Sequence, residues 1–482
     1  MRHSITTMFL LLLLAGRSAV AQEAPTPTLD PPHQAVDMVD IDAQSDEPIV
    51  TQAPATVENP AATPPGMAVA PGVTSARRTN TGDLLDRLYS TRESGITFGG
   101  RVTNFGFGIA GGINRPVPPP LGRGDVFTYT GRGEYDLIFD LEKFGGPPKG
   151  RLLVRAENWY GQYGNVSLRA GTFAPPVFPA LIPVRPNNPG VPYITNFLWT
   201  QPLSKNWVVF AGKKDVLGTF DQDKFAGGDG TDQFINQAFV ANPSFLLGLP
   251  YTSFTAGFVS PRKWGGFSAF VLDPKDRTAD FMQFGDLFAK GIIVGGEVKA
   301  KTMFFDLPGE QHVGGIWKHH PLTDLRIGES TPGVYPELAL PRLPTINDSF
   351  TLYYGFDQYL VRFIEESDRG WGLFGRASIS DGNPTPVQYF LEAGIGGFSP
   401  FGQQRGDRFG MGWYLAGASN QFGPIPQAIF GNRNGTGVEC FYNFQATPWL
   451  NISPSIQWLR PGAGAIAENN AFVYGLRVNV TF

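Results

Sequence analysis

The stretch FVYGLRVNVTF, residues 472–482, alternates between large apolar residues and polar or small ones up to an aromatic end. Side chains of a β-strand point alternately to opposite faces, so this alternation separates two chemistries. The apolar face carries Phe472, Tyr474, Leu476, Val478, Val480 and Phe482, and the other carries Gly475, Arg477, Asn479 and Thr481. One face suits lipid and the other water. A half-buried strand of a soluble sheet shows the same pattern, so its recurrence along the chain decides between the two.

The same alternation returns in earlier segments of the chain. In residues 129–141 the charged residues, among them Arg132 and Glu134, occupy even positions only, while aromatic and aliphatic residues occupy odd ones. Segments 371–380, 438–447 and 450–458 follow the same rule. Clusters of Gly, Pro, Asn and Asp separate such segments, as expected for a transmembrane antiparallel β-barrel.

The first residues indicate export. Arg2 and His3 precede an apolar run from Met8 to Ala15, and small residues follow, so residues 1–21 are predicted to be a secretory signal peptide. The run is roughly half the about 20 apolar residues that a membrane-spanning helix needs, which disfavours an anchor. Without a longer apolar run further on, the exported protein either stays in the periplasm or crosses a membrane as a closed barrel. The 60 Gly, 39 Phe, 15 Tyr and 9 Trp favour the closed barrel.

The rest of the chain divides into three parts. Residues 22–78 are rich in Pro, Ala and acids and lack aromatic residues, which predicts a disordered periplasmic extension. Residues 79–94 are expected to form a short helix, a plug or lid, with leucines at helical spacing. Residues 95–482 are expected to form the barrel, which at roughly 20 to 25 residues per strand and loop gives about 16 strands. Segments 173–193 and 318–346 are too Pro-rich for strands and are expected to fold over or into a pore mouth.

Several other sequence features could suggest a binding or catalytic site, but each has a simpler structural interpretation. The net charge of −4 with no basic patch argues against nucleic acid. The single cysteine, Cys440, has apolar neighbours in its phase and is interpreted as a packing residue. Residues 227–232, GGDGTD, match one copy of a calcium-binding repeat that requires stacked copies, so an acidic glycine loop is favoured. His312, His319 and His320 are expected in an exposed loop rather than as metal ligands. No metal, cofactor or catalytic motif is predicted.

Several groups of residues resemble the carbohydrate-selective porin family of Gram-negative outer membranes, most strongly in the closing region up to residues 475–482. They include ATPWL at 446–450, RGWGLFGR at 369–376, SDGN at 380–383 and GDRFG at 406–410, within a resemblance running from about Leu84 to Phe482. The extension at 22–78 departs from the family pattern. The resemblance implies a passive channel for mono- or small oligosaccharides, with Phe482 similar to the end that outer-membrane assembly machinery recognises.

A neutral sugar both donates and accepts hydrogen bonds, so a pore that favours it should offer mixed donors and acceptors rather than charge of one sign. If the apolar strand faces point to lipid, several charged residues become candidates for the pore lining. These are Arg132, Glu134, Arg155, Glu157, Lys213, Asp215, Arg376, Glu392, Arg408 and Arg477. Each pair could equally be a salt bridge that stiffens the wall. Trp159, Tyr160 and Trp207 could stack on sugars or belong to an interfacial aromatic girdle.

The sequence therefore predicts an all-β outer-membrane porin that conducts carbohydrates such as glucose through a pore lined by paired Arg and Glu. Its expected partners are carbohydrates, membrane lipid and the assembly machinery, and a homo-oligomer is compatible with the sequence. A general non-selective porin is the main alternative. A barrel enzyme or a structural barrel that contacts peptidoglycan is less favoured, because the chain has only 5 His and no clustered catalytic set.

Overall fold

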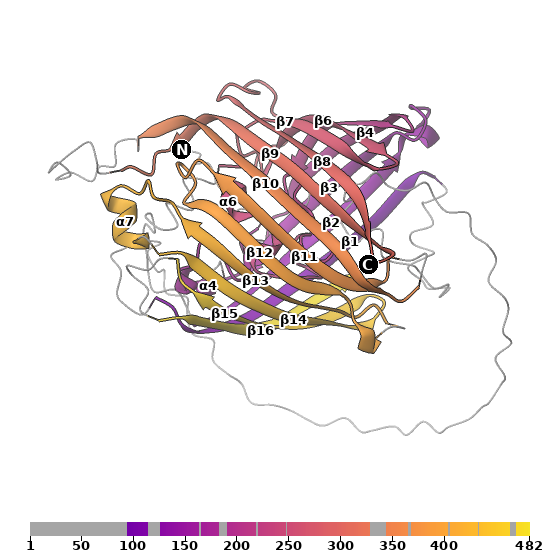
Figure 1. Ribbon diagram of the computed structural model, residues 1–482. Helices are drawn as coiled ribbons and strands as arrows, with labels where there is room; N and C mark the ends of the chain where they lie inside the picture. The colour runs from indigo at the N-terminus through magenta and orange to yellow at the C-terminus, as the bar shows by residue number, and fades with distance from the viewer. Residues whose placement is uncertain are drawn as a thin grey trace, which may run out of the picture. The chain divides into compact units, whose positions relative to one another are not determined.

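The sixteen strands of the computed structural model form one closed antiparallel barrel (Figure 1). Each strand pairs with its neighbours in chain order, and β1 (Ile96–Gly111) closes the ring against β16 (Ala471–Thr481). Arg101 lies opposite Thr481 in that seam, and Ala110 lies opposite Phe472. The structure describes residues 94–113, 126–162, 165–182, 190–217, 220–246, 248–327, 344–364, 368–402, 405–431, 433–462 and 469–482. The predicted 16-stranded barrel is confirmed.

The predicted signal peptide, the extension at 22–78 and nearly all of the predicted helix at 79–94 lie outside the described residues. The other strands, in chain order, are β2 (Phe127–Asp140), β3 (Arg151–Gly161), β4 (Tyr193–Ser204), β5 (Trp207–Asp215), β6 (Thr252–Arg262), β7 (Gly265–Leu272), β8 (Ile292–Phe304), β9 (Leu307–Thr323), β10 (Thr345–Arg362), β11 (Gly370–Ser380), β12 (Val387–Phe398), β13 (Arg408–Ala418), β14 (Gly435–Thr447) and β15 (Leu450–Arg460). The helices are α4 (Asn165–Ala170), α5 (Gln237–Val240), α6 (Pro243–Leu246) and α7 (Pro424–Phe430), with 3-10 turns η2 (Leu141–Phe144), η3 (Phe178–Leu181) and η4 (Pro400–Gly402). Among the described residues, no helix has both the length and the apolar character that a membrane crossing requires.

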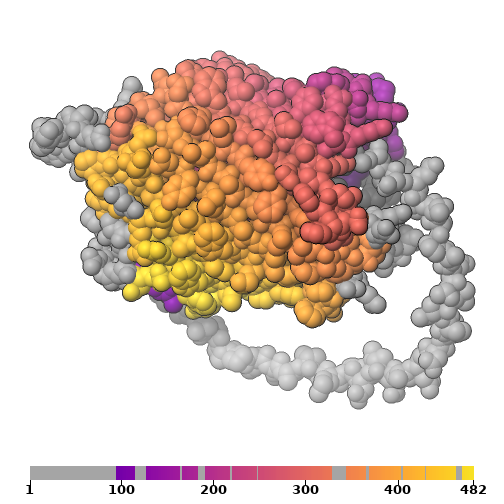
Figure 2. All heavy atoms as spheres, in the orientation of Figure 1, coloured from indigo at the N-terminus to yellow at the C-terminus, as the bar shows by residue number. Residues whose placement is uncertain are grey.

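The outer and inner faces of the wall follow the alternation seen in the sequence. In β16, Phe472, Tyr474 and Leu476 are exposed on the outer face, whereas Arg477 is fully buried on the inner one. Over the later strands, the outer side chains form an unbroken surface (Figure 2). Val473 departs from the pattern because it is apolar, faces inward and is fully buried in the internal hydrophobic cluster.

The two ends of the barrel differ in the length of their connections. At one end the turns are short, with only residues 205–206 between β4 and β5 and 263–264 between β6 and β7. At the other end lie the long segments, including 216–251 between β5 and β6 and 273–291 between β7 and β8. Short turns at one rim and long loops at the other are typical of outer-membrane barrels.

The prediction that 318–346 contains no strand is wrong at both ends of the segment. Strand β9 continues to Thr323, and β10 begins at Thr345. Pro321 is tolerated because it lies where the register of β9 against β10 shifts, between Ile346 and Asp348. A proline lacks the N–H that a regular ladder uses, and a bulge is one of the places where a sheet accepts it.

The interior of the barrel contains a hydrophobic cluster in which loop and wall meet. We call residues 216–251 the inner loop; the structure describes 216–217, 220–246 and 248–251 of it. Its Phe234 and Phe239 are fully buried and pack against wall aromatics. A Cβ added at Gly410 would lie 2.6 Å from the Phe234 ring, and one at Gly412 would lie 2.5 Å from the Phe239 ring. These inward-facing wall glycines let the inner loop approach the wall closely.

Candidate functional site

The inner loop is positioned within the barrel by its own turns and by the wall. Its helix α5 begins after Asn236, whose side-chain oxygen accepts a hydrogen bond from the backbone N–H of Ala238. A second connection, residues 165–182 between β3 and β4, packs beside it: the Phe178 N–H donates to the Ile235 carbonyl, and the Gln237 N–H donates to the Pro175 carbonyl. The inner loop therefore packs between the segment 165–182 and the strands of the barrel wall.

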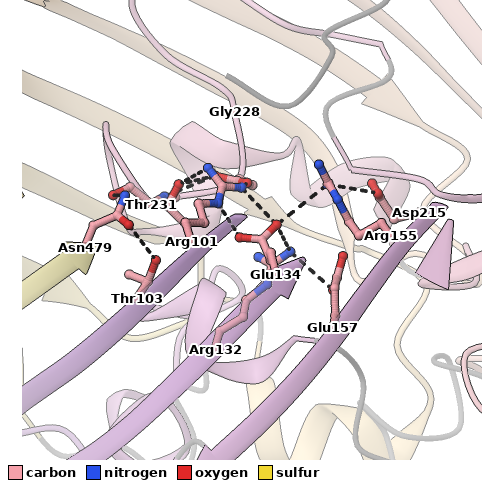
Figure 3. Close-up of polar contacts among 12 residues, drawn as sticks. Arg101, Thr103, Arg132, Glu134, Arg155, Glu157, Asp215, Gly228, Thr231 and Asn479 are labelled. Carbon is pink, nitrogen blue, oxygen red and sulfur yellow. Dashed lines mark hydrogen bonds and ion pairs between the residues drawn. The ribbon is translucent and has the colours of Figure 1, made fainter. Parts of the chain in front are cut away.

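Arg101 of β1 connects the inner loop to the first strands of the wall (Figure 3). Its guanidinium forms ion pairs with Glu134 of β2 and with Asp229 of the inner loop. Its Nη1 also donates to the Thr231 hydroxyl at 2.6 Å. A buried carboxylate from the wall and another from the loop thus share one cation.

Arg132, Glu157 and Tyr251 form a second group, on β2, β3 and the last residue of the inner loop. Arg132 Nη2 lies 3.1 Å from Glu134 Oε1 and 3.4 Å from Glu157 Oε2. The Tyr251 hydroxyl accepts from Arg132 Nη2 at 3.2 Å and donates to Glu157 Oε2 at 2.5 Å. One hydroxyl therefore bridges a guanidinium and a carboxylate at this point of the inner wall.

Arg155 of β3 extends this network along the wall (Figure 3). Its guanidinium lies 2.6 Å from Asp136, 3.6 Å from Asp215 and 3.7 Å from Glu134. Asp215 also accepts from the Asn196 amide at 2.8 Å. The predicted pairs Arg132 with Glu134 and Arg155 with Glu157 lie within one mixed-charge network, although the ion pairs of Arg155 go to Asp136, Asp215 and Glu134 rather than to Glu157.

A second cluster lies on strands β9, β11 and β12. Arg376 Nε lies 2.8 Å from Asp223 and 3.7 Å from Asp221, both in the inner loop, and 3.2 Å from Glu392 of β12. His312 Nε2 lies 3.1 Å from Asp221 Oδ1. Contrary to expectation, all three histidines lie on β9 rather than in an exposed loop, and His312 is buried. The inner loop brings its acidic residues to the cations of this wall.

Strands β13 to β16 hold the inner loop largely through its backbone. Arg477 Nη1 donates to the carbonyl oxygens of Gly230 and Gln233 at 2.7 and 2.8 Å. Glu439 accepts from the backbone N–H groups of Ile235 and Asn236. Arg408 Nη1 lies 3.4 Å from Asp232. Backbone groups that would otherwise be buried without partners are thus paired by wall side chains.

Lys213 does not share the inner network. In the sheet it lies opposite Phe197 and Phe254, and residues directly opposite each other point to the same face. Phe197 lies opposite Val154, next to the inward-facing Arg155, so this row faces outward. Lys213 Nζ donates to the carbonyl oxygens of Ile194 and Asp280. The expected pairing of Lys213 with Asp215 is not seen, because Asp215, the last residue of β5, is held at the inner network by two hydrogen bonds with Asn196.

The three candidate stacking aromatics fall in different places. Trp159 is buried on the inner face, where its indole N–H donates to the Ala180 carbonyl at 3.1 Å. The Tyr160 hydroxyl donates to Asn104, as the exposed Tyr129 does. Trp207 lies at a short turn and packs against Phe258 and Phe267. Tyr160 and Trp207 match the girdle interpretation, whereas Trp159 contacts the connection 165–182 inside the barrel.

Several residues of the site were not among the candidate residues from the sequence: Arg101, Asp221, Asp223 and Tyr251. The available signal was the GGDGTD motif at 227–232, which follows Asp221 and Asp223 and suggested only an acidic glycine loop. Within the described ranges, no group of three or more His, Cys, Asp or Glu side chains is arranged to hold a metal ion.

A closed 16-stranded barrel with long loops at one rim and a loop folded inside it has the architecture of a porin-type membrane channel. Residues 126–482 match the family described as Carbohydrate-selective porin, OprB family. The chain belongs to this family and is an outer-membrane carbohydrate porin of a Gram-negative bacterium. No curated protein matched the chain.

Solved structures share the fold. The high-pH structure of Pseudomonas putida OprB has a TM-score of 0.66 and 16% identity, covering 82% of this chain and 96% of that chain. The low-pH structure of Pseudomonas putida OprB has a TM-score of 0.47 and 14% identity, covering 84% and 98%. A loop-deletion mutant of Vibrio cholerae OmpT has a TM-score of 0.42 and 11% identity, covering 80% and 99%.

Proposed function

We propose that this porin passes mono- and small oligosaccharides by passive diffusion, and that sugar hydroxyls bind beside the inner loop at Arg132 and Glu157. The observation that carries the proposal is the Tyr251 hydroxyl, which accepts from Arg132 and donates to Glu157. A sugar hydroxyl has the same capacity to donate and accept. Arg132 and Glu157 therefore already bind a hydroxyl, the group that a carbohydrate carries in several copies.

Further polar atoms at the same place support this assignment. Among the described side chains, Arg132 Nε and Nη1 and Glu157 Oε1 have no hydrogen-bond partner although they are buried. A buried polar atom without a partner costs about 1–3 kcal/mol, so a hydroxylated solute that reaches it gains on binding. Because donors and an acceptor lie together, the position does not favour solutes of one charge, as a channel for neutral sugars requires.

The other candidate residues have a supporting role in this proposal. Glu134, Arg155 and Asp215 orient Arg132 and Glu157 through the shared network. Arg376, which is paired with Glu392, attaches the inner loop together with Arg408 and Arg477, and these contacts set the width of the passage. Lys213 faces outward and is not part of the proposed sugar path. A mixed lining that holds its constriction rigid can discriminate by both size and hydrogen bonding.

Two further expectations remain proposals. We propose that residues 1–21, 22–78 and 79–94 precede a barrel domain at 95–482, and that assembly machinery recognises Phe482. Phe482 supports the second point because its ring lies 5.9 Å from that of Phe98 and 6.3 Å from that of Tyr135, at the seam where the barrel closes. Its backbone also pairs with Gly100.

Glucose block of single-channel current tests the binding position. Arg132→Lys and Glu157→Gln are each expected to weaken the block by at least about tenfold, because one charge-assisted hydrogen bond contributes about 1.5–3 kcal/mol. Arg151→Lys, at an exposed position of β3, is the matched control and should leave block unchanged. Unchanged block in both variants, with wild-type conductance, would remove Arg132 and Glu157 from the sugar path.

A further inference from the structure

The connection between β7 and β8, residues 273–291, lies on the outside of the barrel wall; we call it the outer hook. The Phe281 ring meets the Phe197 ring of β4 edge to face, with centroids 6.4 Å apart. The Phe284 ring lies 4.8 Å from that of Phe254 of β6. Phe197 and Phe254 belong to the outward-facing row that contains Lys213. The outer hook therefore folds back over the outer face of β4, β5 and β6, close to the rim that carries the long loops.

The underside of the outer hook supplies partners to two buried cations, Lys213 of the wall and Arg277 of the hook itself. Lys213 is only 1% exposed, and its ammonium donates to the Asp280 carbonyl of the hook. Arg277 is fully buried, 2.6 Å from Asp273 and 2.8 Å from Asp286. Its guanidinium also lies 5.6 Å from the centre of the Phe254 ring. An unpaired charge facing hydrocarbon is costly, and these cations have partners.

The upper side of the outer hook is largely apolar. Phe281, Phe284 and Phe288 are 59%, 52% and 40% exposed, more than most aromatic side chains of the described chain. The carboxylate between them, Asp286, is paired with Lys275 and Arg277. The three rings continue the apolar outer wall, where Trp199 of β4 is also exposed. An exposed aromatic patch whose one half-exposed carboxylate, Asp286, is paired with two cations suits the lipid boundary rather than open water.

We propose that the outer hook inserts Phe281, Phe284 and Phe288 among the acyl chains of the surrounding lipid. It then both covers Lys213 and anchors the loop-bearing rim of the barrel at the lipid boundary. Continuity with the lipid-facing wall favours lipid over a protein partner. The proposal does not depend on the sugar-binding position.

Because Cys440 is the only cysteine of the chain, replacing it allows a label to be attached at one chosen position. In a full-length Cys440→Ser background, Phe284→Cys is labelled with a polarity-sensitive fluorophore and the protein is reconstituted into phosphatidylcholine vesicles containing lipid with an acyl-chain nitroxide. Tyr474→Cys, on the lipid-facing side of β16, is the positive control, and Asn420→Cys, exposed in the β13–β14 connection, is the aqueous control. Phe281→Cys serves as the second reporter if Phe284→Cys does not fold.

The hook label is expected to be quenched by the nitroxide lipid about as strongly as the Tyr474 label, and several-fold more than the Asn420 label. Quenching equal to that at Asn420 would place the hook in water and overturn the proposal. Protection from both the nitroxide lipid and a water-soluble quencher would also overturn it, since another protein surface, such as a second copy of this chain, would then cover the rings.

Discussion

Arg376→Ala is expected to detach the inner loop from the wall formed by β9, β11 and β12 and to increase single-channel conductance. In the native chain one guanidinium lies within 3.7 Å of Asp221, Asp223 and Glu392. Without it, three buried carboxyl groups face one another, with the His312 imidazole 3.1 Å from Asp221. Loss of one partner from a buried ion pair costs about 3–5 kcal/mol, and movement of the loop is the available relief.

The measurement is conductance in planar bilayers together with the thermal unfolding midpoint. The variant should show higher and noisier conductance, weaker glucose block and a lower midpoint. Arg376→Lys keeps the charge but loses the planar guanidinium, so it should fall between wild type and Arg376→Ala. Arg151→Ala, at an exposed position, is the matched control and should behave as wild type. Wild-type conductance in Arg376→Ala would contradict the role of this cluster in holding the loop.

Phe239→Ala is expected to have a comparable effect through packing rather than charge. The Phe239 ring is fully buried, with its centroid 4.5 Å from that of Phe234 and 5.9 Å from that of Tyr414. Truncation of a buried phenylalanine to alanine costs about 3–5 kcal/mol, because the cavity collapses only in part. The inner loop should therefore loosen, with a lower unfolding midpoint and a higher conductance.

The matched control is Phe472→Ala, which removes the same side chain from the lipid-facing side of β16. Its conductance should remain that of wild type. Gly412→Leu disrupts the same contact by changing the wall residue, because a Cβ at position 412 would lie 2.5 Å from the Phe239 ring. If Phe239→Ala and Gly412→Leu both keep wild-type conductance, the aromatic cluster does not position the constriction.

The barrel itself could be predicted from the sequence because lipid on one side imposes strict alternation. Residues 129–141 and 472–482 show that pattern, and the structure places Arg132, Glu134 and Arg477 on the inner face as expected. Strand number followed from length, because roughly 20 to 25 residues per strand and connection divide residues 95–482 into about 16 strands. Sequence alone placed β9 and β10 less well, because Pro321 breaks the pattern at a bulge.

The arrangement of the site was harder to predict because it depends on contacts between distant segments. Nothing local in residues 216–251 indicates that they fold inward, since their partners lie on β1, β9, β11 and β16. Lys213 illustrates the opposite error. A charged residue in a barrel strand was expected to face the pore, but the outer hook, itself distant in the chain, covers and pairs it on the outer face.

The central claim is that the chain forms a channel in which mixed donors and acceptors beside the inner loop favour sugars. Swelling of liposomes that contain the purified protein tests it most directly. Swelling should be faster in glucose than in an amino acid or a salt of similar size. Equal rates for all three solutes would contradict selectivity for carbohydrates and leave only a general porin.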